Sequence, residues 1–240
     1  MVSKRRAWPA MVVTSALALI CAITAGIAAS AAGAELTRGP TQAELERAAK
    51  QEIAERWRSW PAGRIFPATL VYYAEQGGEE RARRVGISTK TDCAGSVDRK
   101  AEAALRRAGC RAVLRATYLD ALQGVVVTVG VVALPDELRA VRAKKVFSAS
   151  GKPVPGVRPL AFEGTVTDRF TAAGRQAGSV RQAGPYVVLT TAGQVDGRSA
   201  RAVGEQRPAV FSFAADLGEH VLAELSTPRM PECGTRAWQC

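Results

Sequence analysis

The feature that most constrains this chain is a long stretch near its N-terminus that contains no charged residue. It runs from Ala7 to Ala34, and the basic residues Lys4, Arg5 and Arg6 precede it. A helix needs about 20 apolar residues to cross the hydrocarbon core of a bilayer, so this run can span a membrane. Because basic flanks stay on the cytoplasmic side, we expect the chain from Glu35 onward to lie outside the cytoplasm.

The same stretch allows two fates. It is long enough to remain as an anchor, which would make this a single-pass protein of the cell membrane with its C-terminal domain outside. It also ends in Ala32-Gly33-Ala34 before Glu35, and an A-x-A pattern is typical of a signal peptidase site. The alternative is therefore a protein secreted after cleavage near Ala34.

The charge balance points to anionic partners. The 240 residues include 33 Lys plus Arg and 22 Asp plus Glu, a net charge of +11. Without the three basic residues before Ala7, the balance is 30 − 22 = +8. Outside the cytoplasm, such an excess favours lipid head groups or anionic envelope polymers, and not nucleic acid. The basic residues gather in three clusters: Arg81, Arg83 and Arg84; Arg106, Arg107 and Arg111; and Arg139–Lys145.

The cysteines predict disulfides. Apart from Cys21 in the apolar stretch, the chain has Cys93, Cys110, Cys233 and Cys240. An even number outside the cytoplasm favours two bridges, and four cysteines allow three connectivities. We expect Cys93–Cys110 and Cys233–Cys240, because each pair brackets a short segment. A single His and the absence of metal-type spacing argue against a metal or redox site.

The hydropathy pattern predicts an α+β fold, in which an antiparallel sheet of about six strands carries packed helices behind the N-terminal membrane helix. Short turns between successive strands disfavour a parallel sheet. We divide the chain into an export or transmembrane segment (1–34), a linker (35–40) and an extracytoplasmic domain (41–240), in which the Pro- and Gly-rich segment 148–159 could divide two subdomains. The expected helices are 41–60, 98–108, 135–147 and 210–225, and the expected strands are 66–74, 82–88, 112–119, 125–134, one within 160–170, and 186–195.

Several local signals support these elements. Thr41 and Glu44 form a capping box at the first helix of the domain. Trp57 and Trp60 on that helix are either core contacts or a membrane-interface anchor. The strand at 125–134 is apolar on both faces, which predicts a central position in the sheet. In contrast, the Gly- and Arg-rich segment 172–184 has the composition of a mobile loop.

One resemblance adds to this interpretation. The stretch from Cys110 to Tyr118, the Val-Thr-Val-Gly-Val run at 127–131 and the end Trp238-Gln-Cys240 resemble uncharacterised exported, single-span proteins of high-GC actinobacteria. The composition fits, with 44 Ala, 26 Arg against 7 Lys, and no Asn. The resemblance implies export and transfers no catalytic residue.

The chain contains few candidate catalytic residues. A Ser- or Cys-based nucleophile needs a His as its base, and the only one, His220, lies in a predicted helix beside Glu219. Paired carboxylates could serve a glycosidase, and the candidates at strand ends are Asp120, Glu163, Asp168 and Asp196. We therefore expect no cofactor and a non-enzymatic binding or accessory domain of the cell envelope, with a secreted carboxylate-dependent hydrolase of envelope polymers as the alternative.

Overall fold

The computed structural model describes residues 7–74, 77–204 and 208–229. Its first element is helix α1 (Ala7–Thr37), in which Met11–Leu36 form a continuous apolar segment with a mean hydropathy of 2.2. At 1.5 Å per residue this segment is about 39 Å long, which is enough to cross a bilayer. The hydroxyls of Thr24 and Ser30 donate to carbonyls three residues earlier, so the helix itself satisfies them. The helix can therefore serve as an anchor or as a signal sequence.

The capping box predicted at the start of the domain is present. The backbone N–H of Thr41 donates to Glu44 Oε2 at 2.8 Å, and the N–H of Glu44 donates to Thr41 Oγ1 at 3.4 Å. Arg38 also binds Glu44, and this contact with the hydrogen bonds from Thr41 lowers the pKa of that carboxyl group. Helix α2 (Gln42–Ser59) follows.

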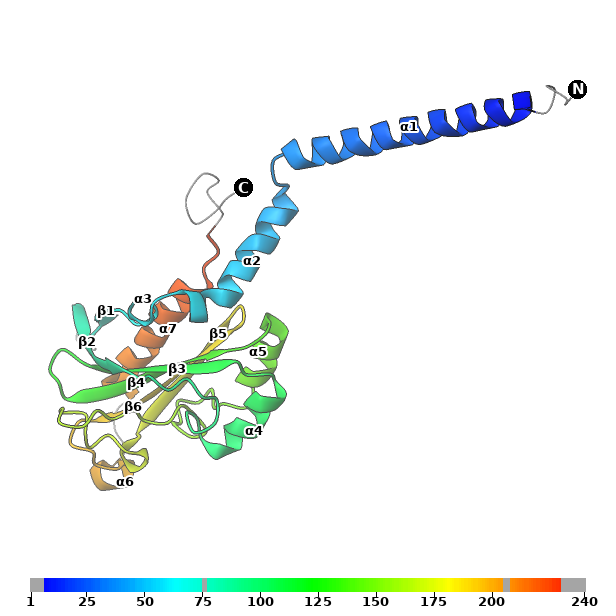
Figure 1. Ribbon diagram of the computed structural model, residues 1–240. Coiled ribbons are helices and arrows are strands. Elements are labelled where there is room, and N and C mark those ends of the chain that lie inside the picture. The colour runs from blue at the N-terminus through cyan, green and yellow to red at the C-terminus, as the bar shows by residue number, and fades with distance from the viewer. Residues whose placement is uncertain (1–6, 75–76, 205–207, 230–240) are drawn as a thin grey trace, which may run out of the picture. The chain divides into compact units, whose positions relative to one another are not determined.

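Two compact units make up the described chain: one ends at Glu46, and the other runs from Arg47 to the end of the described residues. The second unit is built on a six-stranded sheet in which every neighbouring pair is antiparallel, with the strand order β1-β2-β3-β4-β6-β5 (Figure 1). The predicted α+β class with an antiparallel sheet is confirmed. The strands are β1 (Thr69–Tyr73), β2 (Glu79–Ile87), β3 (Ala112–Leu119), β4 (Val125–Ala133), β5 (Ala177–Ala183) and β6 (Tyr186–Gln194).

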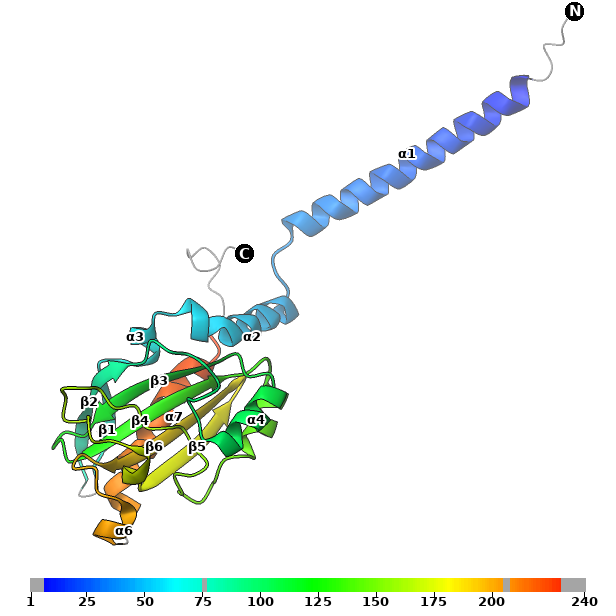
Figure 2. The ribbon, with the colours of Figure 1, turned by 60° about the horizontal axis from the view of Figure 1, so that its bottom comes forward.

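Helices cover both faces of this sheet. Figure 2 shows α7 (Ser212–Ser226) crossing behind the strands, where it shares a core with Ile53 of α2 and Ile65 of α3 (Ala62–Ile65). A second core lies on the opposite face, beneath α4 (Arg99–Arg107) and α5 (Glu137–Lys144). The short elements are the 3₁₀ turns η1 (Ala172–Gly174) and η2 (Pro208–Phe211) and the helix α6 (Ala200–Val203).

Strand β4 joins the two cores. All of its residues are buried, and its side chains alternate, so that Val129 and Val131 pack on the α7 side while Val132 packs on the α4 and α5 side. Alternation across a strand places apolar residues on both faces only where both faces are covered. The predicted central position of this strand is confirmed.

The prediction of a strand within 160–170 is wrong. This segment forms turns, because its hydroxyl groups bind its own backbone: Thr165 Oγ1 donates to the carbonyl of Phe162 at 2.7 Å, and the N–H of Phe162 donates to Thr167 Oγ1 at 3.2 Å. Such local bonds replace those of a β-ladder. The strand in this part of the chain is β5, within the segment that composition assigned to a loop.

The glycine content of β5 has a packing reason. A Cβ atom at Gly178 would lie 2.9 Å from Cα of Pro153, so only glycine lets the segment 148–159 approach the strand this closely. The N–H of Gly178 donates to the carbonyl of Gly151 at 2.9 Å, and Val157 forms a β-bridge with Val97. The segment 148–159 thus lies on the α4 side of the sheet, within the second unit.

Candidate anion-binding site

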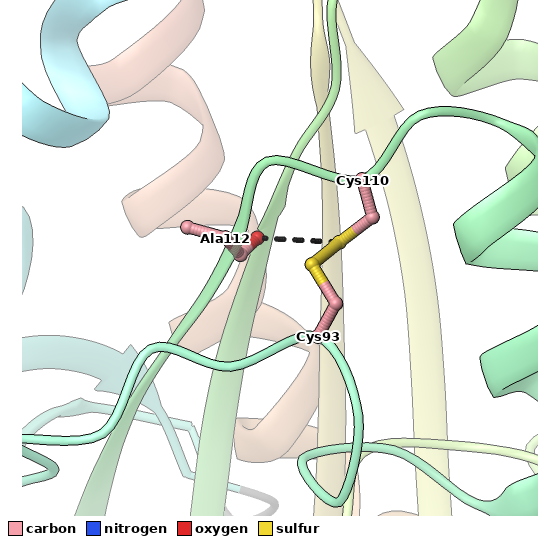
Figure 3. Close-up of a disulfide and its surroundings, with 3 residues drawn as sticks. All are labelled: Cys93, Cys110 and Ala112. Atoms are coloured by element: carbon pink, nitrogen blue, oxygen red, sulfur yellow. Dashed lines mark hydrogen bonds between the residues drawn. A yellow bond between two sulfur atoms is a disulfide. The ribbon is translucent and has the colours of Figure 1, made fainter.

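A disulfide fixes the start of β3. Cys93 and Cys110 are bonded, with their Cα atoms 6.3 Å apart, and Cys110 Sγ lies 3.7 Å from the carbonyl oxygen of Ala112 (Figure 3). This is the first of the two pairs that the spacing predicted. Cys233 and Cys240 lie outside the described residues. The bridge ties the segment after β2 to the chain that leaves α4, and so holds the end of that helix in place.

Helix α4 ends with two arginines at its carboxyl terminus. Gly109 adopts a φ of +77°, which L-residues rarely take, and its N–H donates to the carbonyl of Arg106. The next N–H, of Cys110, reaches back to Leu105, completing a Schellman motif. Arg106 and Arg107 lie in the last turn, where the helix dipole favours positive charge.

Helix α5 also carries basic residues in its last turn. The side chain of Asp136 caps its start by accepting from the N–H of Arg139 at 2.8 Å. Its last turn carries Arg142 and Lys144. The acid at the start of the helix and the cations at its end both interact favourably with the helix dipole, as the arginines at the end of α4 do.

The two helices bring three arginines to one groove. Arg107 of α4 and Arg139 and Arg142 of α5 line a cavity of about 220 Å³ between the helices. All three side chains are exposed. Small or apolar residues form the rest of its lining: Ala104, Ala108, Ala143 and Val146. Members of two basic clusters that the sequence showed separately therefore share one surface, which we call the α4–α5 groove.

The charge in this groove is largely uncompensated. Arg139 lies 3.6 Å from Asp136, and both side chains are about half exposed. Among the described residues, no carboxylate lies within ion-pair distance of Arg107 or Arg142. Exposed guanidinium groups with fixed fork geometry and no acidic partner are suited to phosphate and carboxylate ligands.

The outer face of α5 combines basic and apolar side chains. Leu138 is 60% exposed and Val141 is 38% exposed. Leu138 lies four residues before Arg142, and Val141 lies four residues before Lys145, which is the spacing of neighbours on one helix face. Apolar side chains flanked by cations are typical of helices that rest on anionic bilayers.

The remaining basic cluster, on β2, lies outside this groove. Arg81, Arg83 and Arg84 belong to β2, and they do not line the α4–α5 groove. Arg84 Nη1 donates to the carbonyl of Phe66, so this residue has a structural role. Arg111 is directed to another partner, Glu55, at 3.8 Å.

No known protein family, curated protein or solved structure matches the chain. The assignment of function therefore depends on the geometry of its own residues.

Two of the four candidate carboxylates line the same cavity. Asp168 and Asp196 line a cavity of about 650 Å³ together with Arg169 and Arg198. Asp196 accepts from the backbone N–H of Arg198 at 3.0 Å and from its Nε at 2.5 Å, and these bonds lower the pKa of the Asp196 carboxyl group. A glycosidase needs one carboxyl group whose pKa is raised, so Asp196 is not suited to act as the acid.

The other two candidate carboxylates lie apart. Asp120 closes the turn between β3 and β4 by accepting from the N–H of Val125 at 2.9 Å. It lines a different cavity of about 230 Å³ with Glu80 and Tyr72, whose hydroxyl donates to Glu80. Burial raises the pKa of Tyr72 to about 12, so this hydroxyl stays protonated at neutral pH. Glu163 is exposed in a loop and lines neither cavity.

The remaining sequence candidates have structural positions. His220 is exposed on α7, and the part of the chain that the structure describes contains no group of three potential metal ligands. Trp57 and Trp60 pack against the core on the α7 face, which confirms the core-contact interpretation. The guanidinium carbon of Arg64 lies 3.5 Å from the centroid of the Trp60 ring.

Sequence reasoning did not identify the buried arginines. Arg56, Arg115 and Arg175 are each at most 9% exposed. One signal was available for Arg115, which occupies an inward position of its strand, between Val113 and Thr117. Arg56 has a local partner in Glu52, but its carbonyl acceptors near the end of α7 and the carboxylate bound by Arg175 come from distant parts of the chain, so no local pattern indicates that these two residues are buried.

Proposed function

We propose that this chain is a non-enzymatic, extracytoplasmic domain of the cell envelope that binds anionic, phosphate-bearing surfaces through its α4–α5 groove. The observation that carries the proposal is the convergence of Arg107, Arg139 and Arg142 on one groove between two helices. Its ligands are lipid head groups or anionic envelope polymers.

The proposed location has two supports. Helix α1 is long and apolar enough to anchor the protein in the cell membrane as a single-pass protein, or to direct its secretion if it is cleaved near Ala34. The Cys93–Cys110 bridge fits an oxidising compartment outside the cytoplasm. Both agree with the resemblance to exported actinobacterial proteins, which we retain as a proposal.

The proposed ligand chemistry follows from the charges. Three exposed guanidinium groups in one groove attract phosphate oxygens, and Arg binds these in a bidentate manner. The exposed Leu138 and Val141 on the outer face of α5 add apolar contact with a bilayer surface. Each basic residue near an anionic lipid surface contributes about 1 kcal/mol, so three together are worth about 100-fold in binding.

The test uses the full chain in neutral phosphatidylcholine nanodiscs. Flotation with vesicles of phosphatidylcholine, with and without phosphatidylglycerol, measures lipid binding, and titration with inorganic polyphosphate measures polymer binding. We expect the chain to bind one of the two anionic probes, and we expect this binding to weaken as the salt concentration rises. The triple variant Arg107→Gln, Arg139→Gln, Arg142→Gln should bind about 100-fold more weakly.

A matched control separates the groove from net charge. The triple variant Arg81→Gln, Arg83→Gln, Lys90→Gln removes the same charge from exposed positions that do not line the groove. It should bind like the unaltered chain. Equal losses in both triple variants would mean that binding follows overall charge, and absence of binding to both probes would overturn the proposal.

The cavity with Asp168 and Asp196 supports a second candidate, a carboxylate-dependent hydrolase of envelope polymers. The test is the release of reducing ends from purified cell-wall polysaccharide. Release that disappears in Asp168→Asn would favour the hydrolase, while a chain without such activity leaves binding as the function.

A further inference from the structure

Among the described residues of the domain, three arginines are buried, and they differ in how their charges are compensated. A guanidinium group stays protonated in proteins, so burying one is costly unless acceptors surround it. Arg56 Nε donates to Glu52, and its Nη1 donates to three carbonyl oxygens near the end of α7. Arg175 binds both carboxylate oxygens of Asp98, at 2.9 and 3.0 Å.

Arg115 has no such arrangement. It lies on β3 and is 9% exposed, and its Nε is buried with no acceptor. Its Nη1 donates to the carbonyl of Arg158 at 3.4 Å, which is close to the limit for a hydrogen bond. No carboxylate among the described residues forms an ion pair with it. Burial, and then the like charge of Arg158, lower the pKa of Arg115.

The segment that carries Arg158 is held firmly over the sheet. Val157 occupies the space above Gly130, the residue opposite Arg115, where a Cβ atom would lie 2.7 Å from Val157 Cγ2. The N–H of Arg158 donates to the carbonyl of Ser96 at 2.9 Å. The backbone on both sides of Arg158 is therefore fixed beside Arg115, while its side chain is exposed and its charge acts on Arg115.

The neighbouring backbone is fixed as well. Thr117 Oγ1 donates to the carbonyl of Leu160 at 2.6 Å, and the N–H of Leu160 donates to Thr128 Oγ1 at 3.0 Å. Thr117 and Thr128 face each other on β3 and β4. Arg115 is thus held beside the backbone of Arg158 by a rigid frame, and no carboxylate of the described residues pairs with it. A bound anion would compensate its charge and that of Arg158.

We propose that Arg115 and Arg158 bind one phosphate group of an anionic ligand, at a site separate from the α4–α5 groove. Two guanidinium groups carry two positive charges, which match a phosphate monoester with a charge of about −1.5 to −2 and three acceptor oxygens. A carboxylate supplies a single charge and would leave one guanidinium uncompensated. The site needs no residue of the α4–α5 groove, so it stands or falls independently of the proposed function.

The test measures how phosphate affects the full chain in neutral detergent micelles. Inorganic phosphate is titrated at constant ionic strength, with chloride as the replacement anion, and the thermal unfolding midpoint and calorimetric binding are recorded. The background is the Arg107→Gln, Arg139→Gln, Arg142→Gln variant, so that the α4–α5 groove makes no contribution. We expect phosphate to raise the midpoint and acetate to have little effect.

Arg115→Met provides the decisive comparison. It removes a buried charge that the fold does not compensate, so without phosphate its unfolding midpoint should equal or exceed that of the background. It should also lose the phosphate-dependent rise and bind phosphate at least tenfold more weakly. Arg158→Gln, at an exposed position, should weaken phosphate binding in the same way without changing the midpoint in chloride.

Three results would overturn the proposal. Unchanged phosphate binding in Arg115→Met would show that the anion binds elsewhere. A midpoint in chloride that falls in Arg115→Met would show that the fold already compensates this charge. An equal rise with acetate and with phosphate would replace the phosphate group by a carboxylate.

Discussion

Replacing Arg175 with methionine should destabilise the domain by about 3–5 kcal/mol, because it removes a buried cation and leaves a largely buried carboxylate unpaired. The side chain of Arg175 is 6% exposed and that of Asp98 is 17% exposed. Their two hydrogen bonds, at 2.9 and 3.0 Å, join the start of α4 to the chain that leads into β5. In the variant, Asp98 keeps the N–H of Gly156 at 2.8 Å as its described donor.

The assay is urea unfolding of the full chain in neutral detergent, followed by the fluorescence of Trp57 and Trp60, which pack on the core. Linear extrapolation gives the free energy of unfolding in water. The matched control is Arg198→Met, which breaks another Arg–Asp pair, with Asp196. Because those side chains are 60% and 40% exposed, the control should leave the midpoint nearly unchanged.

The double variant Asp98→Asn, Arg175→Met tests the physical reason for the loss. If an unpaired buried charge is responsible, removing both charges should recover part of the stability that Arg175→Met alone loses. A loss below about 1 kcal/mol in Arg175→Met would refute the reasoning, since an exposed pair has that value. A double variant less stable than both single variants would also contradict it.

Two further predictions concern the disulfide and a buried tyrosine. The double variant Cys93→Ser, Cys110→Ser should lower the free energy of unfolding by about 3 kcal/mol, which is the chain-entropy value for a loop of this size. Urea unfolding of the variant is compared with that of the oxidised, unaltered chain. An unchanged midpoint would show that the bridge adds no constraint. The hydroxyl of Tyr186 donates to the carbonyl of Ile53 at 2.5 Å, and burial raises the pKa of Tyr186 to about 12. The protonated hydroxyl therefore stabilises the fold below about pH 10, the ordinary pKa of tyrosine. This contribution is lost as the pH rises from about 10 to 12. Tyr186→Phe should cost about 1 kcal/mol at neutral pH and flatten the decline of stability across that alkaline range, and a decline as steep as in the unaltered chain would contradict the assignment.

Much of the fold could be predicted from local patterns. The apolar run of α1, the capping box at Thr41 and Glu44, and the glycine cap at Gly109 each depend on neighbouring residues alone. The two-sided apolar pattern of β4 predicted its central position, because only covered faces tolerate it. Short spacing also pointed to the Cys93–Cys110 bridge.

Two errors had different physical causes, a distant contact in one case and a local turn in the other. Strand β5 resembles a loop in composition, because Gly178 is there to admit Pro153 and not to break the strand. The segment 160–170 has strand-like residues, yet Thr165 and Thr167 bind its own backbone and turn it. Neither reason is visible before the chain is folded, because each needs a partner from another element or a turn geometry.

The sequence by itself determined which side chains could carry function: it has an excess of arginine, a single histidine, no recognised catalytic motif and an apolar N-terminal segment. Only the tertiary structure decided which of these arginines lie close together. Arg107 joins Arg139 and Arg142 because α4 and α5 both pack on one face of the sheet. Arg115 reaches the backbone carbonyl of Arg158 because Gly130 lets the loop that carries Val157 lie against the strand. Charge is a property of each residue, but compensation of charge depends on distances that only the packed fold sets.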